Sequence, residues 1–359
     1  MTGDVRGSPL ARTLLGAYLA LVAYASLHPF SGWRGHGASP LGFLEAPWPR
    51  YVTGFDLAAN VAAYVPLGAL GVLALVPRLR GAAAALVAVI GAALVSAAVE
   101  AAQSYLPSRI PSIADLACNV AGAAAGALAA LALSGWLLET GPLRRAREAL
   151  VVPGALADFG LVLLALWLFV QLDPTTVLFG AGDLRSLLSA APGPAREPGF
   201  FIAVEALVAG ANLLAVALLG SAILREGAPA RVALLGLVLA ALAVRALGFA
   251  ILMRAEVGFD WLTPGGAQGL VAGLLLAMVA FALPRTGRLA VAAVLLMAAT
   301  VFVNLAPPNP YTAATIKVWA QGHFLHFNGL TRLASMLWPF AAIAWSLVLA
   351  ARAPREDGR

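Results

Sequence analysis

Two stretches of the chain each combine an acid and an amide one helical turn apart. Residues 53–62 read TGFDLAANVA and residues 112–121 read SIADLACNVA, so both fit [ST]-x-x-D-L-A-x-N-V-A. At this spacing the two side chains share one face of a helix, where they can hydrogen-bond to each other or to a polar ligand. The repeated pattern indicates a duplicated helical hairpin in which both motif-bearing helices run in the same direction.

Each acid also fits a purely local role. The residue three positions before Asp56 and before Asp115 is Thr or Ser, which is the spacing of a capping box at a helix start. The carboxylate there satisfies free backbone N–H groups and favours the positive end of the helix dipole. A cap leaves the amides Asn60 and Asn119 unexplained, because they lie one turn deeper and must find partners on a neighbouring helix or on a ligand.

A polar stripe ends the apolar run that precedes the second copy. Ser96, Glu100, Gln103 and Ser104 recur at helical spacing, and Arg109 follows beyond a proline. A carboxylate inside a membrane segment is costly and is therefore a functional-site hypothesis by default. Two interpretations stay open at this stage: an ion pair between Glu100 and Arg109 that locks the loop, or a site that handles a ligand or a proton.

The composition identifies the elements that must carry these side chains. The chain has 359 residues, of which 61% are hydrophobic and 11% are charged, with a mean hydropathy of +0.89. Soluble domains carry roughly 25% charged residues, so the sequence predicts an integral membrane protein. The formal net charge of +6 comes from 22 arginines and one lysine, Lys317, scattered in twos and threes without a basic stripe, which argues against nucleic acid as a partner.

The predicted fold class is all-α, a polytopic bundle of about ten membrane-spanning helices. A span needs about 20 apolar residues. Fourteen of the 23 cations fall on the side of the N-terminus and eight on the other, which predicts that both termini are cytoplasmic in the cell membrane. The ten predicted spans are 11–28, 54–76, 82–105, 113–137, 153–172, 200–224, 231–252, 265–283, 288–304 and 331–350.

The hydrophilic segment ETGPLRRAREAL separates the first four spans from the last six. We therefore expect two domains, a four-span domain over residues 1–140 and a six-span membrane domain over residues 141–359. The longer loops on the extracytoplasmic side carry Trp33 and Trp48, which are suited to the membrane interface.

The stretches LHPF, FDLAANVAAYVPLG and VEAAQSYLPSRIPSIADLACNVAGAAAG together resemble the VanZ-like membrane proteins. That family is typified by a protein that raises teicoplanin resistance. The resemblance covers roughly residues 10–135 and implies a bacterial cell-envelope protein, without an assigned catalytic role. An effect on glycopeptide susceptibility is an expectation to test, since this chain is longer than the typical four- or five-span member. The signature positions are Asp56, Asn60, Pro66, Gly68, Glu100, Gln103, Arg109, Asp115, Asn119 and Gly122.

Secondary candidates lie in the six-span part. Glu205 and Arg245 fall within apolar runs, and a structural pair between them is the favoured interpretation, because an isolated charge in lipid is unfavourable. His323 and His326 are three residues apart, a spacing that two metal ligands can use, but no cysteine and no clear third ligand accompanies them. We expect no metal and no cofactor.

Three functional interpretations follow from these residues. The favoured one is a factor that binds a membrane lipid or an envelope precursor at the extracytoplasmic face, with Arg109 recognising a phosphate or carboxylate. The second is an enzyme with Glu100 as general acid or base, although no metal or nucleophile motif supports it and its catalytic residues are unknown. The third is a transporter. The parallel repeat supports this interpretation, whereas the lack of broken helices at matching positions argues against it. The candidate ligand-binding residues are Asp56, Asn60, Glu100, Gln103, Arg109, Asp115 and Asn119.

Overall fold

The computed structural model describes most of the chain as α-helices. Within the described residues there is no strand, and the one isolated β-bridge joins Val151 and Leu224. The described residues are 9–28, 30–35, 37, 39–49, 53–76, 78–134, 142–188, 196–252, 259, 261–310 and 325–352.

A helix occupies each of the ten predicted spans, which confirms the all-α membrane fold. Eight of these helices are long and apolar enough to cross a membrane. The other two, α6 and α10, have 16 and 17 residues, so α6 is about 24 Å long at 1.5 Å per residue. The ten helices are α1 (Pro9–Leu27), α2 (Gly54–Leu75), α3 (Gly81–Gln103), α4 (Ile113–Ser134), α6 (Ala155–Val170), α8 (Pro198–Ala222), α9 (Ala230–Leu252), α10 (Pro264–Ala280), α11 (Arg285–Leu305) and α13 (Leu325–Ala351).

The chain divides into two compact units, Met1–Ala149 and Leu150–Arg359. The boundary falls at the end of the short helix α5 (Pro142–Leu150), which carries the hydrophilic segment between the two sets of spans.

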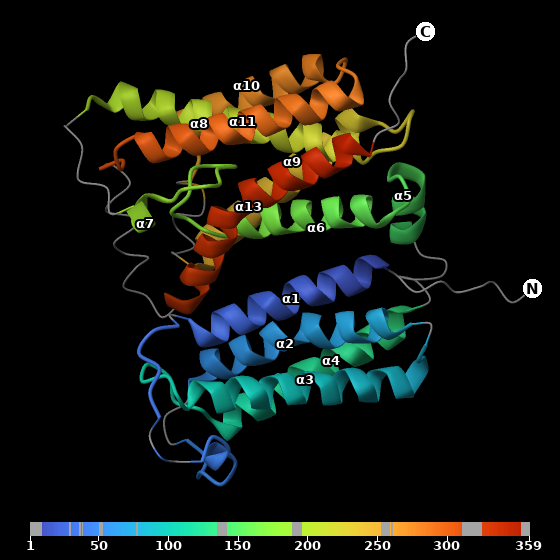
Figure 1. Ribbon diagram of the computed structural model, residues 1–359, viewed down its shortest axis with the longest axis vertical. Coiled ribbons are helices and arrows are strands. Elements are labelled where there is room, and N and C mark those ends of the chain that lie inside the picture. The colour runs from blue at the N-terminus through green and yellow to red at the C-terminus, as the bar shows by residue number, and fades with distance from the viewer. Residues whose placement is uncertain are drawn as a thin grey trace, which may run out of the picture. The chain divides into compact units, whose positions relative to one another are not determined.

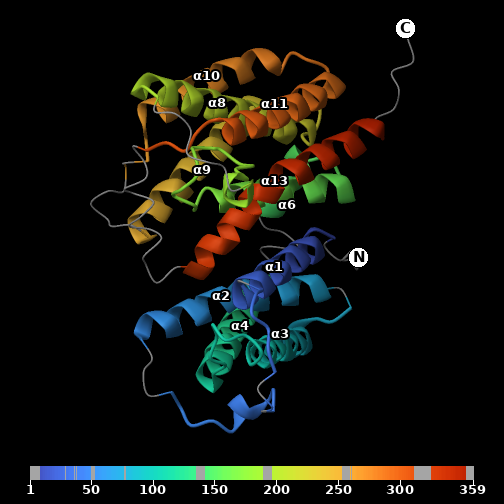
Figure 2. The ribbon, with the colours of Figure 1, turned by 60° about the vertical axis from the view of Figure 1, so that its left-hand side comes forward.

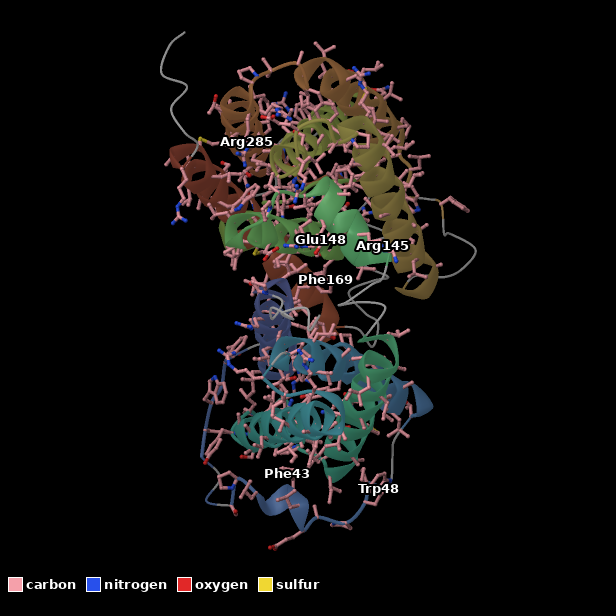
Figure 3. All side chains as sticks on the ribbon, turned by 90° about the vertical axis from the view of Figure 1, so that its right-hand side faces the viewer. Phe43, Trp48, Arg145, Glu148, Phe169 and Arg285 are labelled. Carbon is pink, nitrogen blue, oxygen red and sulfur yellow. The ribbon has the colours of Figure 1, made fainter. Side chains whose placement is uncertain are left out.

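The first unit is a bundle of α1, α2, α3 and α4, which lie side by side in Figure 1 and Figure 2. Helix α2 packs most extensively against α4, and α3 lies against both of them. The segment between α1 and α2 contains the 3-10 helix η1 (Gly42–Leu44), in which Phe43 is buried, whereas Trp48 is 59% exposed (Figure 3).

Glycines bring the backbones of α2 and α4 into direct contact. A Cβ added at Gly122 would lie 2.1 Å from the carbonyl oxygen of Val61, and one added at Gly126 would lie 1.9 Å from that of Val65. Both contacts advance in the same direction along the chain, so the two helices are parallel, as the repeated motif predicts. Small residues four apart permit this close approach between membrane helices.

Pro66 lies inside α2, where its missing N–H interrupts the helical hydrogen bonds. A neighbouring helix supplies a donor close to this point, because the Tyr18 hydroxyl of α1 donates to the carbonyl oxygen of Ala63 at 2.7 Å. This hydrogen bond gives a carbonyl in the turn before Pro66 a donor from a neighbouring helix.

The second unit is built around α8, whose residues are the most buried of the membrane helices. Helix α10 packs along it through Gly265, Gly269 and Gly273, while α11 packs on α8 and α13 packs on both α11 and α6. The segment 171–184, between α6 and the short helix α7 (Arg185–Leu188), is not helical, yet Gln171, Phe179 and several other residues in it are almost fully buried.

Candidate functional site

The first motif forms the predicted capping box. The Thr53 hydroxyl accepts a hydrogen bond from the Asp56 backbone N–H at 3.1 Å, and the Asp56 carboxylate accepts from the Thr53 backbone N–H at 3.3 Å. The Thr53 hydroxyl also donates to the same carboxylate at 2.6 Å. Asp56 is exposed, and its carboxylate is hydrogen-bonded at the start of its own helix. These contacts establish its role as a helix cap.

The second motif uses a different acid for the same task. The backbone N–H of Ser112 donates to Oε2 of Glu100 at 2.9 Å, so the carboxylate comes from α3 rather than from α4 itself. The Ser112 hydroxyl accepts from the backbone N–H of Ala114 at 3.1 Å. Asp115 is thereby released from the reciprocal capping that its counterpart Asp56 performs.

The released carboxylate of Asp115 joins the two repeats. Its Oδ1 accepts a hydrogen bond from Nδ2 of Asn60 at 2.8 Å, which links α4 to α2. Both side chains are half-buried. The amide of the first motif copy, Asn60, is therefore hydrogen-bonded to the acid of the second copy, Asp115, on the adjacent helix.

The second amide lies deeper among the helices. Nδ2 of Asn119 donates to the hydroxyl of Ser96 on α3 at 2.9 Å, and both residues are buried. Oδ1 of Asn119 has no hydrogen-bond partner, and neither has the hydroxyl of Tyr64 on α2. Tyr64 is 3% exposed and Asn119 is 6% exposed. Buried polar atoms without partners are uncommon in proteins, so this pair needs an explanation.

The loop after α3 is fastened to the end of α1. Gln103 donates through Nε2 to the carbonyl oxygen of Ser26 at 2.8 Å. Arg109 donates through Nη2 to the carbonyl oxygens of Ala25 at 2.7 Å and His28 at 3.4 Å, while its Nε is buried without a partner. The guanidinium is thus held at Nη2, while its Nε–H has no acceptor.

The predicted ion pair between Glu100 and Arg109 does not form among the described residues. Glu100 binds a backbone N–H and Arg109 binds backbone carbonyls, so each is satisfied by the chain rather than by the other. Their charges still interact. Burial lowers the pKa of the Arg109 guanidinium, and the carboxylates of Glu100 and Asp115 partly offset this effect. Burial, and secondly the charge of Arg109, lowers the pKa of His28.

The structure therefore places six of the seven predicted residues in one region of α2, α3, α4 and the loop after α3, with Asp56 at its exposed edge. Among the seven, one hydrogen bond joins two members directly, that between Asn60 and Asp115. We call the seven residues the α2–α4 polar cluster. Sequence reasoning missed Tyr64 as part of this region, although it lies four residues after Asn60 and so shares its helix face. The cluster comprises Asp56, Asn60, Glu100, Gln103, Arg109, Asp115 and Asn119.

The predicted pair between Glu205 and Arg245 is wrong. Glu205 accepts hydrogen bonds from the Thr263 hydroxyl at 2.8 Å and from Nδ2 of Asn309 at 3.0 Å. Arg245 is 3% exposed and donates to the backbone carbonyls of the buried segment 171–184 instead. The physical reason is that this non-helical backbone has carbonyls that lack helical partners, and a guanidinium with five donors can satisfy several of them at once.

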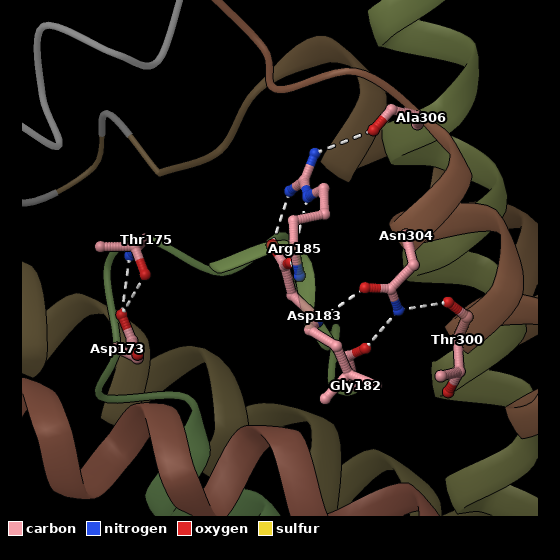
Figure 4. Close-up of polar contacts among 9 residues, drawn as sticks. Asp173, Thr175, Gly182, Asp183, Arg185, Thr300, Asn304 and Ala306 are labelled. Carbon is pink, nitrogen blue, oxygen red and sulfur yellow. Dashed lines mark hydrogen bonds and ion pairs between the residues drawn. The ribbon is translucent and has the colours of Figure 1, made fainter. Parts of the chain in front are cut away.

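Other side chains hold the same buried segment in place. Nδ2 of Asn304 donates to the carbonyl oxygen of Gly182 at 2.7 Å, and its Oδ1 accepts from the Leu184 backbone N–H at 2.7 Å (Figure 4). Asp183 pairs with Arg185 at 2.5 Å, and Arg185 also reaches the carbonyl oxygen of Ala306. These contacts hold the segment 171–184 within the second unit, where Glu205 and Arg245 also have hydrogen-bond partners.

The predicted histidine pair lies outside what the structure describes. His323 is not among the described residues, and of His326 only the backbone, within α13, is described. Among the residues searched, no group of three or more His, Cys, Asp or Glu side chains has the arrangement of a metal site.

Comparison with protein families gives a match to the VanZ/LLP1 family model over residues 11–134. This range agrees with the predicted resemblance and contains the whole α2–α4 polar cluster. Comparison with curated proteins and with solved structures gives no match. The chain thus consists of a VanZ-like N-terminal region and an additional C-terminal region, in a multi-pass, all-α membrane protein.

Proposed function

We propose that the VanZ-like region of this membrane protein binds the polar head group of a membrane lipid or of a lipid-linked envelope precursor. The observation that carries the proposal is the state of Arg109. Its Nη2 is fixed on the carbonyls at the end of α1, while its buried Nε has no partner. A guanidinium held in this way is suited to a phosphate or carboxylate, since the cost of ordering the side chain is already met by the protein.

The surroundings of Arg109 support a ligand rather than a purely structural role. The neighbouring acids are engaged elsewhere: Glu100 accepts from the Ser112 backbone and Asp115 accepts from Asn60. Neither forms an ion pair with the arginine within the described part of the chain. A half-buried cation that lacks a paired anion is expected to attract one.

We also propose an orientation and a division of the chain. The excess of arginine in alternate short loops favours cytoplasmic termini in the cell membrane, which puts the polar cluster at the extracytoplasmic side of a bacterial envelope. We assign residues 1–140 to a VanZ-like four-span domain and residues 141–359 to a six-span membrane domain. Cysteine-accessibility labelling of single-cysteine variants in the loops, on intact cells, tests this orientation.

The test of function is native mass spectrometry with lipid extraction on the full-length protein purified in detergent. We expect the wild type to retain a defined phosphate- or carboxylate-bearing lipid and the Arg109→Ala variant to lose it. Arg34→Ala is the matched control, because Arg34 is exposed on the segment after α1. Equal retention of bulk lipid by all three proteins would refute the proposal. Conversion of the retained lipid over time would instead indicate an enzyme.

A cellular test follows for glycopeptides. Expression of the wild-type chain in a susceptible strain should change the inhibitory concentration of teicoplanin, and Arg109→Ala should abolish the change at equal protein level. An unchanged concentration with a retained lipid would separate lipid binding from antibiotic susceptibility.

A further inference from the structure

The interior of the first unit contains buried oxygen atoms that lack hydrogen-bond donors. They are Oδ1 of Asn119 and the hydroxyl oxygen of Tyr64. Beside them lies Glu100, whose Oε2 accepts from Ser112 and whose residue is 3% exposed, so all three side chains are more than nine-tenths buried. We call the side chains of Asn119, Tyr64 and Glu100 the buried acceptors.

The buried acceptors belong to one neighbourhood on three helices. Asn119 of α4 is hydrogen-bonded to Ser96, which lies one turn from Glu100 on α3. The hydroxyl of Tyr64, on α2, lies near both Ser96 and Glu100 but forms no hydrogen bond of acceptable distance and angle. A group placed among them would therefore meet oxygen atoms from several directions.

This neighbourhood also contains more acidic than basic side chains. The carboxylates of Glu100 and Asp115 lie close enough to interact, and Arg109 forms no ion pair with either of them in the described part of the chain. A buried charge is unfavourable unless it is paired. A primary ammonium has three N–H donors and one positive charge, so it suits a group of buried oxygen acceptors beside carboxyl groups.

We propose that Glu100, Asn119 and Tyr64 form a subsite for a primary ammonium group. The inference rests on the proposed function, because Arg109 would bind the phosphate of the same ligand. The ligand class is accordingly a zwitterion that joins a phosphate ester to a primary ammonium, as in an ethanolamine head group. The phosphate end lies at the loop after α3, and the ammonium end points toward the interior of the bundle.

The first experiment needs only the wild-type protein. Purified full-length protein is offered phosphatidylethanolamine, phosphatidylcholine or phosphatidylglycerol with identical acyl chains, and retention is measured by native mass spectrometry. Phosphatidylcholine has the same charges but no N–H donors, so it isolates the hydrogen bonds. We expect phosphatidylethanolamine to be retained about tenfold more strongly or better, because hydrogen bonds to charged groups are at stake.

Competition separates the head group from the rest of the lipid. Free phosphoethanolamine should displace bound phosphatidylethanolamine, whereas free phosphocholine should not. Equal displacement by both compounds would contradict an ammonium subsite.

Variants locate the subsite. Tyr64→Phe removes one buried acceptor, and Glu100→Gln removes the charge while keeping an oxygen for Ser112; both should reduce the preference for phosphatidylethanolamine over phosphatidylcholine. Tyr18→Phe and Glu45→Gln are the matched controls, since Tyr18 donates to Ala63 and Glu45 is exposed. A preference that is unchanged in Tyr64→Phe and Glu100→Gln would place the ammonium elsewhere and overturn the assignment.

The two proposals can fail separately. Equal retention of all three lipids by the wild type, still lost in Arg109→Ala, would refute the ammonium subsite and leave phosphate binding in place. Retention that is unaffected by Arg109→Ala would refute the proposed function itself.

Discussion

The close contact between α2 and α4 makes a quantitative prediction for Gly122→Ala. The new Cβ would lie 2.1 Å from the carbonyl oxygen of Val61, whereas ordinary contact begins at 3.4 Å. The two backbones would have to separate by roughly 1.3 Å, because a carbonyl inside a helix cannot rotate away. We expect a loss of about 1–3 kcal/mol of unfolding free energy, the usual cost of overpacking.

The matched control is Gly91→Ala on α3. A Cβ at Gly91 would meet no atom within 4 Å, so this variant should gain up to about 1 kcal/mol from the higher helix propensity of alanine. The comparison removes propensity from the argument, since both variants make the same chemical change in a helix of the same unit.

Reversible unfolding in mixed micelles, with the full-length chain, measures both variants. Separation of the helices should also stretch the 2.8 Å hydrogen bond between Asn60 and Asp115, so lipid retention should fall together with stability. A Gly122→Ala protein as stable as Gly91→Ala, with unchanged lipid retention, would refute the account of this interface.

Three further predictions concern other contacts. A double-mutant cycle of Asn60→Ala and Asp115→Ala, read by unfolding in micelles, should give a coupling of about 1 kcal/mol, and a coupling of zero would mean that the link contributes nothing. Arg245→Leu should cost about 3 kcal/mol or more, because several buried carbonyls lose their donor, and the thermal stability of Arg245→Lys should lie between those of Arg245→Leu and the wild type. The pKa of His28, followed by NMR with labelled histidine, should lie below 6.5, and Arg109→Ala should raise it part of the way because burial remains. The neutral form of His28 is favoured in the folded protein, so its contribution to stability is complete above pH 6.5 and declines as the pH falls toward the lowered pKa.

The sequence predicts the helices well because a membrane span depends on local composition. Each of the ten predicted runs contains a helix, and the capping box of Asp56 forms because all of its atoms lie within four residues. The same local rule fails at Asp115. There the backbone N–H of Ser112 meets Glu100 from another helix, and no pattern within α4 reveals that competitor.

The partners of the charged side chains are the feature of this structure that the sequence predicts least well. Glu100 with Arg109, and Glu205 with Arg245, are the expected partners because opposite charges in a membrane attract. In the structure both arginines donate to backbone carbonyls, at the end of α1 and in the segment 171–184. Such carbonyls have no sequence signature, because every residue carries one, and only the tertiary fold shows which of them lack partners.

The buried segment 171–184 determines when the second unit can fold during synthesis. Its carbonyls at Gln171 and Asp173 receive their hydrogen bonds from Arg245, more than seventy residues later, and the Asp173 carboxylate receives one from Thr331, 158 residues later. During synthesis these carbonyl and carboxylate groups lack their hydrogen-bond donors until the later helices have been translated. We therefore expect the second unit to acquire protease resistance only after α13 has been translated and inserted, whereas every helix of the first bundle is already available when residue 134 has emerged.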